Sequence, residues 1–308
     1  MPGVSDVTTA QLRYFVEAAE NLSMTRAAEN LMVAQSAVSS SVAQLERSIG
    51  VQLFIRKPAK GLVLTAAGER FHHEARGLLA SLEEALESAR GEVNKAAGRV
   101  TLACFVTLVP FFIPGLLSHL GALHPNLRVD VIETDSDGMM SALHAGRAEL
   151  GLGYAFSVSQ AVRAEQVGTA KPYALISERH RLARSKSVSL ERLRQEPMIL
   201  LDLPVSRDYF LGMFRATGDE PDIRYRSGNY ETVRSLVAQG QGFSILNQMP
   251  ASSVTYSGES VVNLEIRGEV PSLPLIISTL DGVKPTARSR AVSEGIRTVV
   301  RSRNAHAQ

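Results

Sequence analysis

The sequence contains a single cysteine, Cys104, and no tryptophan among its 308 residues. One cysteine can form neither an intramolecular disulfide nor a cysteine-based zinc site, so a reducing cytoplasm is the expected compartment. No apolar run approaches the roughly 20 residues that a membrane span requires, and the N-terminus lacks the cationic and apolar regions of a secretory signal. We therefore expect a protein that neither crosses nor leaves the membrane.

A strong charge of either sign is also missing, because 33 lysines and arginines are nearly balanced by 31 aspartates and glutamates. The net charge of +2 does not by itself indicate nucleic-acid binding. Enzyme signatures are weak: His72 and His73 lack the spacing of a zinc helix, and Ser244 lacks the second glycine of a nucleophile elbow. No glycine-rich nucleotide loop occurs, so no enzyme, metal or cofactor is predicted.

The hydrophobic pattern divides the chain near residue 100. Helical periodicity dominates residues 1 to 100, whereas β-branched runs alternate with helical stretches after that point, which predicts parallel sheets with crossover helices. Strands are expected at 100–105, 127–133, 150–153, 173–177, 198–201, 223–226, 242–246, 261–266 and 273–278, and helices at 111–123, 136–145, 206–217, 230–239 and 287–301. More than 200 such residues suggest two small sheets.

The N-terminal part predicts a winged helix-turn-helix. Helical segments at 11–20, 23–31 and 36–49 are followed by a basic hairpin that carries Arg56, Lys57 and Lys60. The last helix has an apolar side and a side of small polar residues, which fits the roughly 12 Å major groove of DNA. Cations in the hairpin, or wing, suit phosphate or the minor groove.

A longer helix is expected from about residue 66 to 97, with apolar residues at alternating four- and three-residue steps. These residues are Ala75, Leu79, Leu82, Leu86, Ala89, Val93 and Ala96. The seam could pack against its own domain, but no nearby apolar segment is left to cover it. We therefore favour self-association through this helix.

Several motifs, taken together, resemble the LysR-type transcriptional regulators over the entire chain. In the N-terminal part they are LRYFVEAAE from Leu12, TRAAENL from Thr25, AVS from Ala37, LERSIGVQLFIR from Leu45 and LTAAGE from Leu64. In the C-terminal part they are ETDSDGMMSALHAGRAELGLG from Glu133 and YETVRSLVAQGQGFSILNQ from Tyr230.

The resemblance implies three parts: a winged helix-turn-helix domain at 1–66, a linker and dimerisation helix at 67–98, and an α/β effector domain at 99–308. The effector domain would comprise two periplasmic-binding-protein-like subdomains, one at about 99–170 and 276–308 and the other at about 171–275. The chain would cross between the sheets near 169–172 and again near 273–277. The implied partners are an operator in double-stranded DNA, a small-molecule inducer and further copies of the chain, as a dimer or a dimer of dimers. RNA polymerase is a further candidate partner.

By motif position, the resemblance implies DNA contacts in three places. Base contacts are expected from Gln35, Ser36, Ser39 and Ser40, phosphate approach from Thr25 and Arg26, and wing contacts from Arg56, Lys57 and Lys60. The sequence departs from the family pattern within the recognition helix, where Ala34 replaces a capping serine, Ser36 a proline and Ser40 a larger residue, often arginine. The loss of a bidentate arginine removes about 1–3 kcal/mol of base discrimination, so recognition shifts towards Gln35, the wing and DNA shape. The alternative for the serines is a solvated helix face.

The ends of the predicted parallel strands indicate an effector site, because ligands gather at the carboxyl edge of such sheets. The candidate residues at these ends are Val106, Thr107, Tyr154, Asp202, Arg207, Tyr209, Asn229 and Phe243. Thr107 would donate a hydrogen bond, and Tyr209 or Phe243 would cover an apolar body. The alternatives are that Thr107 caps its helix, and that Asp202 and Arg207 pair with each other instead of dividing between the ends of a zwitterion.

Two functions of different class follow. We predict a sequence-specific transcriptional regulator whose DNA binding or promoter activation is modulated by an inducer in the C-terminal domain. The alternative is an inducer-independent repressor or architectural protein that uses its α/β part only for assembly.

Overall fold

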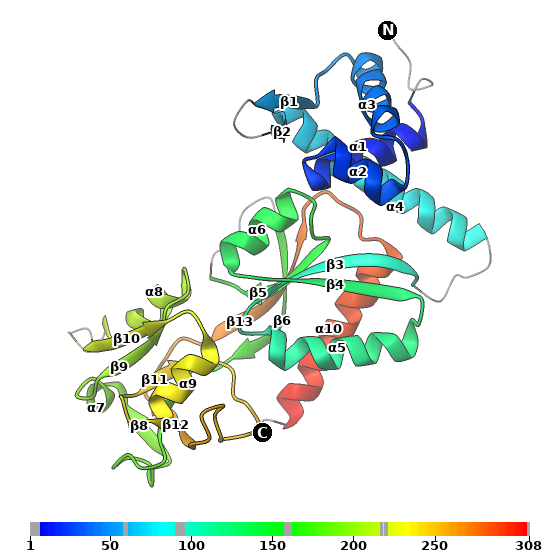
Figure 1. Ribbon diagram of the computed structural model, residues 1–308. Coiled ribbons are helices and arrows are strands. Elements are labelled where there is room, and N and C mark those ends of the chain that lie inside the picture. Colours follow the sequence, from blue (N-terminus) through cyan, green and yellow to red (C-terminus); the bar gives the residue numbers. More distant parts are fainter. Residues whose placement is uncertain are drawn as a thin grey trace.

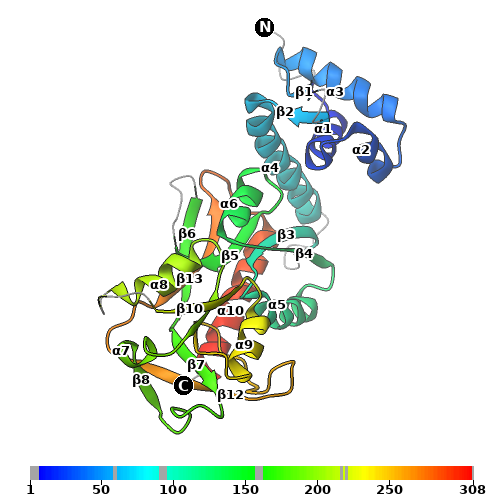
Figure 2. The ribbon, with the colours of Figure 1, turned by 60° about the vertical axis from the view of Figure 1, so that its left-hand side comes forward.

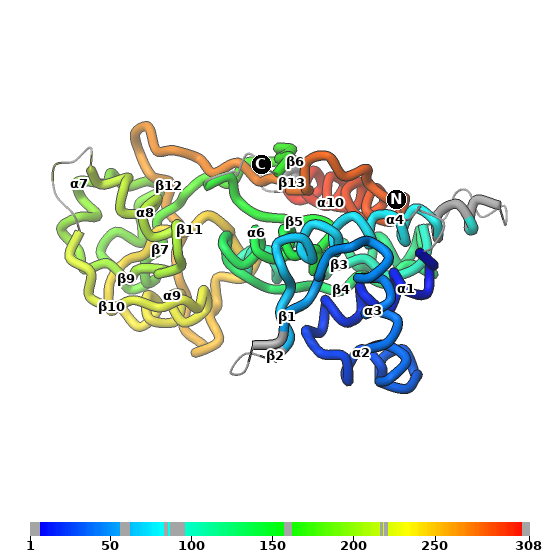
Figure 3. Tube along the Cα trace, turned by 90° about the horizontal axis from the view of Figure 1, so that it is seen from above, coloured from blue at the N-terminus to red at the C-terminus, as the bar shows by residue number. Residues whose placement is uncertain are grey.

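The computed structural model describes residues 7–57, 61–89, 96–156, 162–215, 218 and 221–306. An N-terminal helical domain lies beside an α/β domain that consists of two subdomains (Figure 1). Seen from above, the N-terminal domain lies over the first subdomain and away from the second (Figure 3). None of the described helices combines the length and the apolar character that crossing a membrane requires.

Three short helices begin the N-terminal domain: α1 (Thr9–Asn21), α2 (Met24–Leu31) and α3 (Gln35–Ile49). They pack around Phe15, which is completely buried. Thr8 and Gln11 form a capping box at the start of α1, and the Ser23 hydroxyl accepts the Arg26 amide at 3.2 Å at the start of α2. Local caps and apolar periodicity thus account for the helix-turn-helix that the sequence predicts.

The predicted wing is an antiparallel hairpin of β1 (Phe54–Lys57) and β2 (Gly61–Leu64). The Glu46 carboxylate of α3 accepts the backbone amides of Leu53 and Phe54 at 2.7 and 3.0 Å, which holds the wing against the helix. Gly68 lies so close to this junction that a Cβ atom would be 2.1 Å from the carbonyl oxygen of Leu53. Only glycine permits this approach, which explains the glycine of the LTAAGE motif.

The long helix α4 (Ala66–Ala89) follows the wing. Its predicted seam is divided by the structure: Ala75 and Leu79 pack in the N-terminal core, whereas Leu82 and Leu86 are 36% and 49% exposed. The sequence predicts that this helix continues to residue 97. That is wrong for its last residues, because Ala96 is not helical and is buried in the core of the α/β domain. Val93 lies outside the described residues.

The first subdomain has a five-stranded sheet in the order β4-β3-β5-β13-β6. Its strands are β3 (Gly98–Phe105), β4 (Leu127–Thr134), β5 (Leu150–Tyr154), β6 (Val162–Ala170) and β13 (Leu273–Leu280). Its helices are α5 (Val109–Leu123) and α10 (Ala287–His306), which share one apolar cluster with β3, and α6 (Ser136–His144), which packs in another. The predicted all-parallel arrangement is wrong here, because β13 runs antiparallel to β5 and β6.

The second subdomain has a four-stranded sheet, β11-β7-β12-β8, and a parallel pair, β10-β9. Its strands are β7 (Tyr173–Ser177), β8 (Ser187–Ser189), β9 (Met198–Leu201), β10 (Ile223–Ser227), β11 (Ser244–Leu246) and β12 (Val261–Arg267). Its helices are α7 (Leu190–Leu193), α8 (Ser206–Gly212) and α9 (Tyr230–Ala238). The pairs β7–β11 and β7–β12 are antiparallel, which again differs from the parallel prediction.

The chain crosses between the two sheets at two places. The first crossing, at 171–172, joins β6 to β7 where the sequence predicts it, and the second, at 268–272, joins β12 to β13. The second therefore precedes the predicted position, because β13 already belongs to the first sheet at Leu273. Strand β6 was not predicted: it is an edge strand with mostly exposed residues, so it lacks a run of apolar side chains.

Candidate DNA-binding face and effector cleft

Helix α3 separates a buried apolar side from an open polar side. Val38, Val42 and Leu45 are buried against the rest of the domain. Gln35, Ser36 and Ser40 are exposed, and Ser39 is half-buried; on α2, Thr25 and Arg26 are exposed. The polar side can therefore enter a groove without disturbing the core.

Two details of α3 limit what it can recognise. The N-cap residue of α3, Ala34, provides no side-chain cap, so no capping side chain competes with a phosphate for the backbone amides of Gln35 and Ser36. The Ser40 hydroxyl donates to the Ala37 carbonyl at 3.2 Å, so it can offer a base only an acceptor. Gln35 is the longest of the four predicted base-contacting side chains, and its amide can both donate and accept.

The wing cations are only partly defined. Arg56 and Lys57 lie on β1, where the backbone is described but their side chains are not, and Lys60 lies outside the described residues. Their predicted contacts with DNA therefore stay predictions.

An aromatic inner pocket lies between the two subdomains. It is lined by Thr107, Tyr154, Phe156, Leu201, Ser206, Phe210, Tyr230, Leu246, Asn247, Gln248 and Leu273, none of which is charged. The Gln248 side chain donates to the Tyr154 hydroxyl at 3.2 Å, and its backbone carbonyl accepts from the hydroxyls of Tyr173 and Tyr230. Burial raises the pKa of Tyr154 far above its usual range and that of Tyr230 to about 12, so both phenols are neutral.

A larger outer cleft of about 930 Å³ lies beside this pocket. Val106, Thr107, Phe111 and Glu133 from the first subdomain line it, as does Arg303 at the end of α10. On the other side it is bordered by α9 and residues 250–257.

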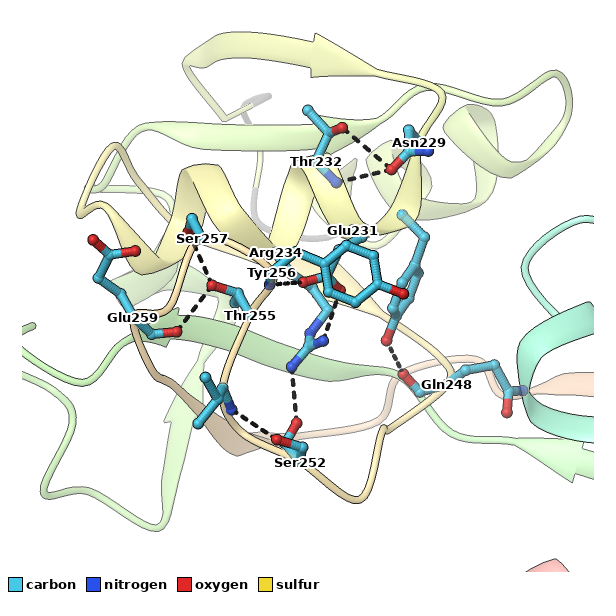
Figure 4. Close-up of polar contacts among 12 residues, drawn as sticks. Asn229, Glu231, Thr232, Arg234, Gln248, Ser252, Thr255, Tyr256, Ser257 and Glu259 are labelled. Atoms are coloured by element: carbon cyan, nitrogen blue, oxygen red, sulfur yellow. Dashed lines mark hydrogen bonds and ion pairs between the residues drawn. The ribbon is translucent and has the colours of Figure 1, made fainter.

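The second subdomain's wall of this cleft is held by polar contacts, as Figure 4 shows. Arg234 is 4% exposed and donates to the Glu231 carboxylate at 2.7 Å and to the Ser252 carbonyl at 2.9 Å. The second carboxylate oxygen of Glu231 accepts the Tyr256 amide at 2.8 Å. Asn229 caps α9 by accepting the Thr232 amide at 2.9 Å. These contacts tie the start of α9 to residues 252–256 of the neighbouring loop.

Several contacts join the subdomains. The rings of Phe111 and Tyr230 meet edge to face with centroids 5.7 Å apart, and Gln248 reaches Tyr154. Arg303 donates to the Met249 carbonyl at 2.7 Å while its guanidinium lies 4.7 Å from the Phe111 ring centroid.

The structure brings together half of the residues predicted for the effector site. Val106, Thr107 and Asn229 line the outer cleft, and Tyr154 lines the inner pocket with Thr107. Tyr209 borders the same region, where its hydroxyl accepts from Asn247 at 3.1 Å.

Two predicted contacts lie elsewhere. Asp202 and Arg207 pair with each other at 3.3 Å and line neither cavity, which corresponds to the pairing alternative. Phe243 was expected to cover a ligand, but it is 1% exposed and packs against Phe214 in the core of the second subdomain. Its neighbour Gly242 lies so close to Pro197 that a Cβ atom would be 2.1 Å from the Pro197 carbonyl oxygen.

Sequence reasoning missed Phe111, Gln248 and Arg303. Phe111 and Arg303 lie on helices whose patterns show only amphipathicity, and Gln248 follows a short strand at the end of a family motif. The one signal in the sequence was that Gln248 is a polar residue shortly after β11, where a side chain can reach a pocket. Their convergence depends on packing between elements distant in the sequence.

Comparisons with known proteins agree with this architecture. Residues 9–69 match the family described as "Bacterial regulatory helix-turn-helix protein, lysR family", and residues 94–301 match the "LysR substrate binding domain". The structure of HinK, a LysR family transcriptional regulator from Pseudomonas aeruginosa, is 34% identical and covers 95% of this chain and 98% of HinK, with a TM-score of 0.64. CfxR of Cupriavidus necator, an HTH-type transcriptional regulator, is 33% identical over 245 residues, which are 78% of this chain and 76% of CfxR. A full-length OxyR variant from Pseudomonas aeruginosa shares the fold at 24% identity and a TM-score of 0.77, over 96% of this chain and 95% of OxyR.

The chain therefore belongs to the LysR family of bacterial transcriptional regulators. It is a transcriptional regulator with a helix-turn-helix DNA-binding domain and an effector-binding domain, and modulation by an inducer is typical of its family. The resemblance, the winged helix-turn-helix and the two-part α/β domain predicted from the sequence are confirmed.

Proposed function

We propose that the polar side of α3 reads an operator in the major groove while the wing contacts its backbone, and that an inducer binds between the two effector subdomains. One observation carries the proposal for the inducer: Thr107 borders both the inner pocket and the outer cleft. It lies between β3 and α5, where a ligand can meet a hydroxyl and the start of a helix. DNA recognition rests on Gln35, Ser36, Ser39 and Ser40, with Thr25 and Arg26 near phosphate.

A second candidate function is that of a regulator that needs no inducer. The inner pocket encloses only about 10 Å³, and direct contacts between the subdomains close it. A regulator that needs no inducer would look the same, with the aromatic side chains serving as a permanent core. The outer cleft of about 930 Å³ favours ligand binding, because it leaves space beside Thr107 that no side chain fills.

Thermal unfolding against a panel of bacterial metabolites separates these functions. A ligand present at 100 times its Kd stabilises the native state by about 2.7 kcal/mol, which shifts the melting temperature measurably. Thr107→Val keeps the side-chain shape and removes the hydroxyl, so it should weaken binding of the identified ligand while leaving operator binding intact. A panel with no stabilising compound favours the inducer-independent function. Wild-type affinity in Thr107→Val would place the ligand elsewhere.

Further partners belong to the same proposal. We propose self-association through the exposed leucines of α4, to a dimer and then a tetramer, and a contact with RNA polymerase when the regulator activates transcription. Because the operator is chromosomal DNA, the protein acts in the cytoplasm. No catalytic role is proposed for any residue. Mapping the bound DNA across the genome identifies the target genes and, from their products, the chemical class of inducer.

A further inference from the structure

Among the described residues, helix α4 meets the effector domain of its own chain at a small joint around Gly146. Two side chains one turn apart on α4, His72 and Arg76, face the turn between α6 and β5. A Cβ atom at Gly146 would lie 3.1 Å from the Arg76 guanidinium and 3.3 Å from the His72 ring. The absence of a side chain at this position lets the helix and the turn meet. In Figure 2, α4 runs past α6, the helix that precedes this turn.

A row of charged side chains crosses this joint. Arg76 Nε lies 3.4 Å from the Glu20 carboxylate of α1, and Arg76 Nη2 lies 4.0 Å from the Glu149 carboxylate of the effector domain. The other oxygen of Glu149 lies 3.5 Å from Arg288 Nε and accepts from the Thr286 hydroxyl at 3.4 Å. Arg76 thus stands between one carboxylate from each domain, and these groups are mostly buried.

The joint is small. Among the described elements, α4 makes its larger contacts with α1 and β2 of its own domain. A cavity of about 80 Å³ remains between α4 and the effector domain beside Arg76 and Glu149.

Glu149 and Arg288, the effector-domain residues of the joint, lie next to or near the start of elements that end at the effector cleft. Glu149 directly precedes β5, which ends at Tyr154 in the inner pocket, roughly 17 Å along an extended strand. Arg288 lies in the first turn of α10, and Arg303 lies 15 residues later, roughly 22 Å along the helix, where it crosses to Met249 of the second subdomain. A shift of the subdomains at the cleft therefore moves rigid elements that hold the joint.

We propose that Arg76 and Glu149 form a releasable joint through which the effector domain fixes the orientation of the DNA-binding domain. While the joint is closed, the two domains of one chain move together, and the two recognition helices of an oligomer are held at one separation. When movement at the cleft displaces β5 or α10, Arg76 loses Glu149 and keeps Glu20, so the DNA-binding domain stays intact and turns freely.

The first test measures the orientation directly. Spin labels at exposed positions 29 and 163, introduced as Glu29→Cys and Arg163→Cys, report the distance between the domains by pulsed electron resonance; Cys104 is buried and takes no label. Labelled chains are diluted about tenfold into unlabelled protein so that one pair is observed per oligomer. We expect a single narrow distance in the parent protein and a broadened distribution in Glu149→Gln.

A matched control comes from the same subdomain. Arg99→Gln removes an ion pair between Arg99 Nε and the Asp130 carboxylate, which lie 2.9 Å apart on the neighbouring strands β3 and β4. This pair lies within one subdomain, so the variant should show the same narrow distribution of distances between the labels as the parent protein. Arg76→Gln should broaden the distribution as Glu149→Gln does, and the double variant should be no broader than either single one. An unchanged distribution in Glu149→Gln, or equal broadening in Arg99→Gln, overturns the proposal.

The second test asks whether the joint matters for DNA. An operator selected from random DNA by the parent protein is lengthened by one or two base pairs between its half-sites. The parent should lose affinity steeply, whereas Glu149→Gln should tolerate the insertion, with spacing discrimination reduced at least about fivefold, at the lower end of typical coupling between sites. Unchanged discrimination in a variant with a released joint would refute the regulatory role, and loss of binding to every spacing would show that Glu149 acts on folding alone.

Discussion

His72 should make the stability of the DNA-binding domain depend on pH. Its side chain is 2% exposed against Phe15, and burial, followed by the nearby charge of Arg76, lowers its pKa from 6.5 to about 4. In the unfolded chain the imidazole is solvated and takes up a proton near pH 6.5. The unfolded state therefore binds more protons than the native state between these values, so the native state is favoured fully above pH 6.5 and loses this advantage as the pH falls towards 4.

The size of the effect follows from the two pKa values. A difference of about 2.5 units corresponds to about 3 kcal/mol once the pH is below both values. Between about pH 7.5 and pH 5 the expected loss is about 2 kcal/mol, because at pH 5 the native imidazole is still almost entirely neutral. His72→Gln replaces the imidazole by a group that does not titrate, so it should remove this part of the pH dependence.

Hydrogen exchange measures this in the intact protein. The most protected amides of α1 and α4 report the opening of the domain that contains His72, after correction for the intrinsic effect of pH on exchange. When the pH is lowered from about 7.5 to 5, the free energy of opening of these amides should fall by about 2 kcal/mol more in the parent protein than in His72→Gln. Amides in β3, which belongs to the effector domain, provide an internal control and should show no such difference. An equal pH dependence of the α1 and α4 amides in both proteins would refute the assignment of a buried neutral imidazole.

Three further variants test the other parts. Gly68→Ala places a Cβ atom 2.1 Å from a backbone oxygen, so it should lower stability by about 1–3 kcal/mol and displace the wing; an unchanged melting temperature contradicts the close approach. Leu82→Glu with Leu86→Glu puts like charges on the exposed apolar side of α4 and should give monomers that bind DNA poorly, whereas sedimentation at the parent's size would exclude α4 as the interface. Arg56→Ala should weaken operator binding and flatten its salt dependence by up to about one phosphate, and an identical salt slope would remove Arg56 from the interface.

Much of the N-terminal domain follows from the sequence alone because its signals are local. Ser23 and Thr8 cap helices within three residues of themselves, and the spacing of Val38, Val42 and Leu45 defines the buried side of α3. The same holds for most strands of the effector domain, which are short apolar runs. Strand β6 escaped prediction because an edge strand needs few apolar side chains to stay in place.

The candidate effector site was only partly predictable, because its residues come from segments far apart in the chain. Thr107 lies at the end of a strand, which the sequence marks, but Arg303 reaches the cleft only because α10 packs beside α5 and runs towards Met249. Phe243 directly precedes a strand, as a pocket residue would, yet its ring is buried in the core of the second subdomain.

The sequence by itself determined most of the helices and strands and the family pattern that they follow. Only the tertiary structure decided which strands run antiparallel, where the chain returns to the first sheet, and that Arg76 meets Glu149. The physical reason is the range of the interactions. Caps, turns and apolar periodicity act over a few residues, whereas strand pairing and ion pairs between domains depend on how the whole chain is folded back on itself.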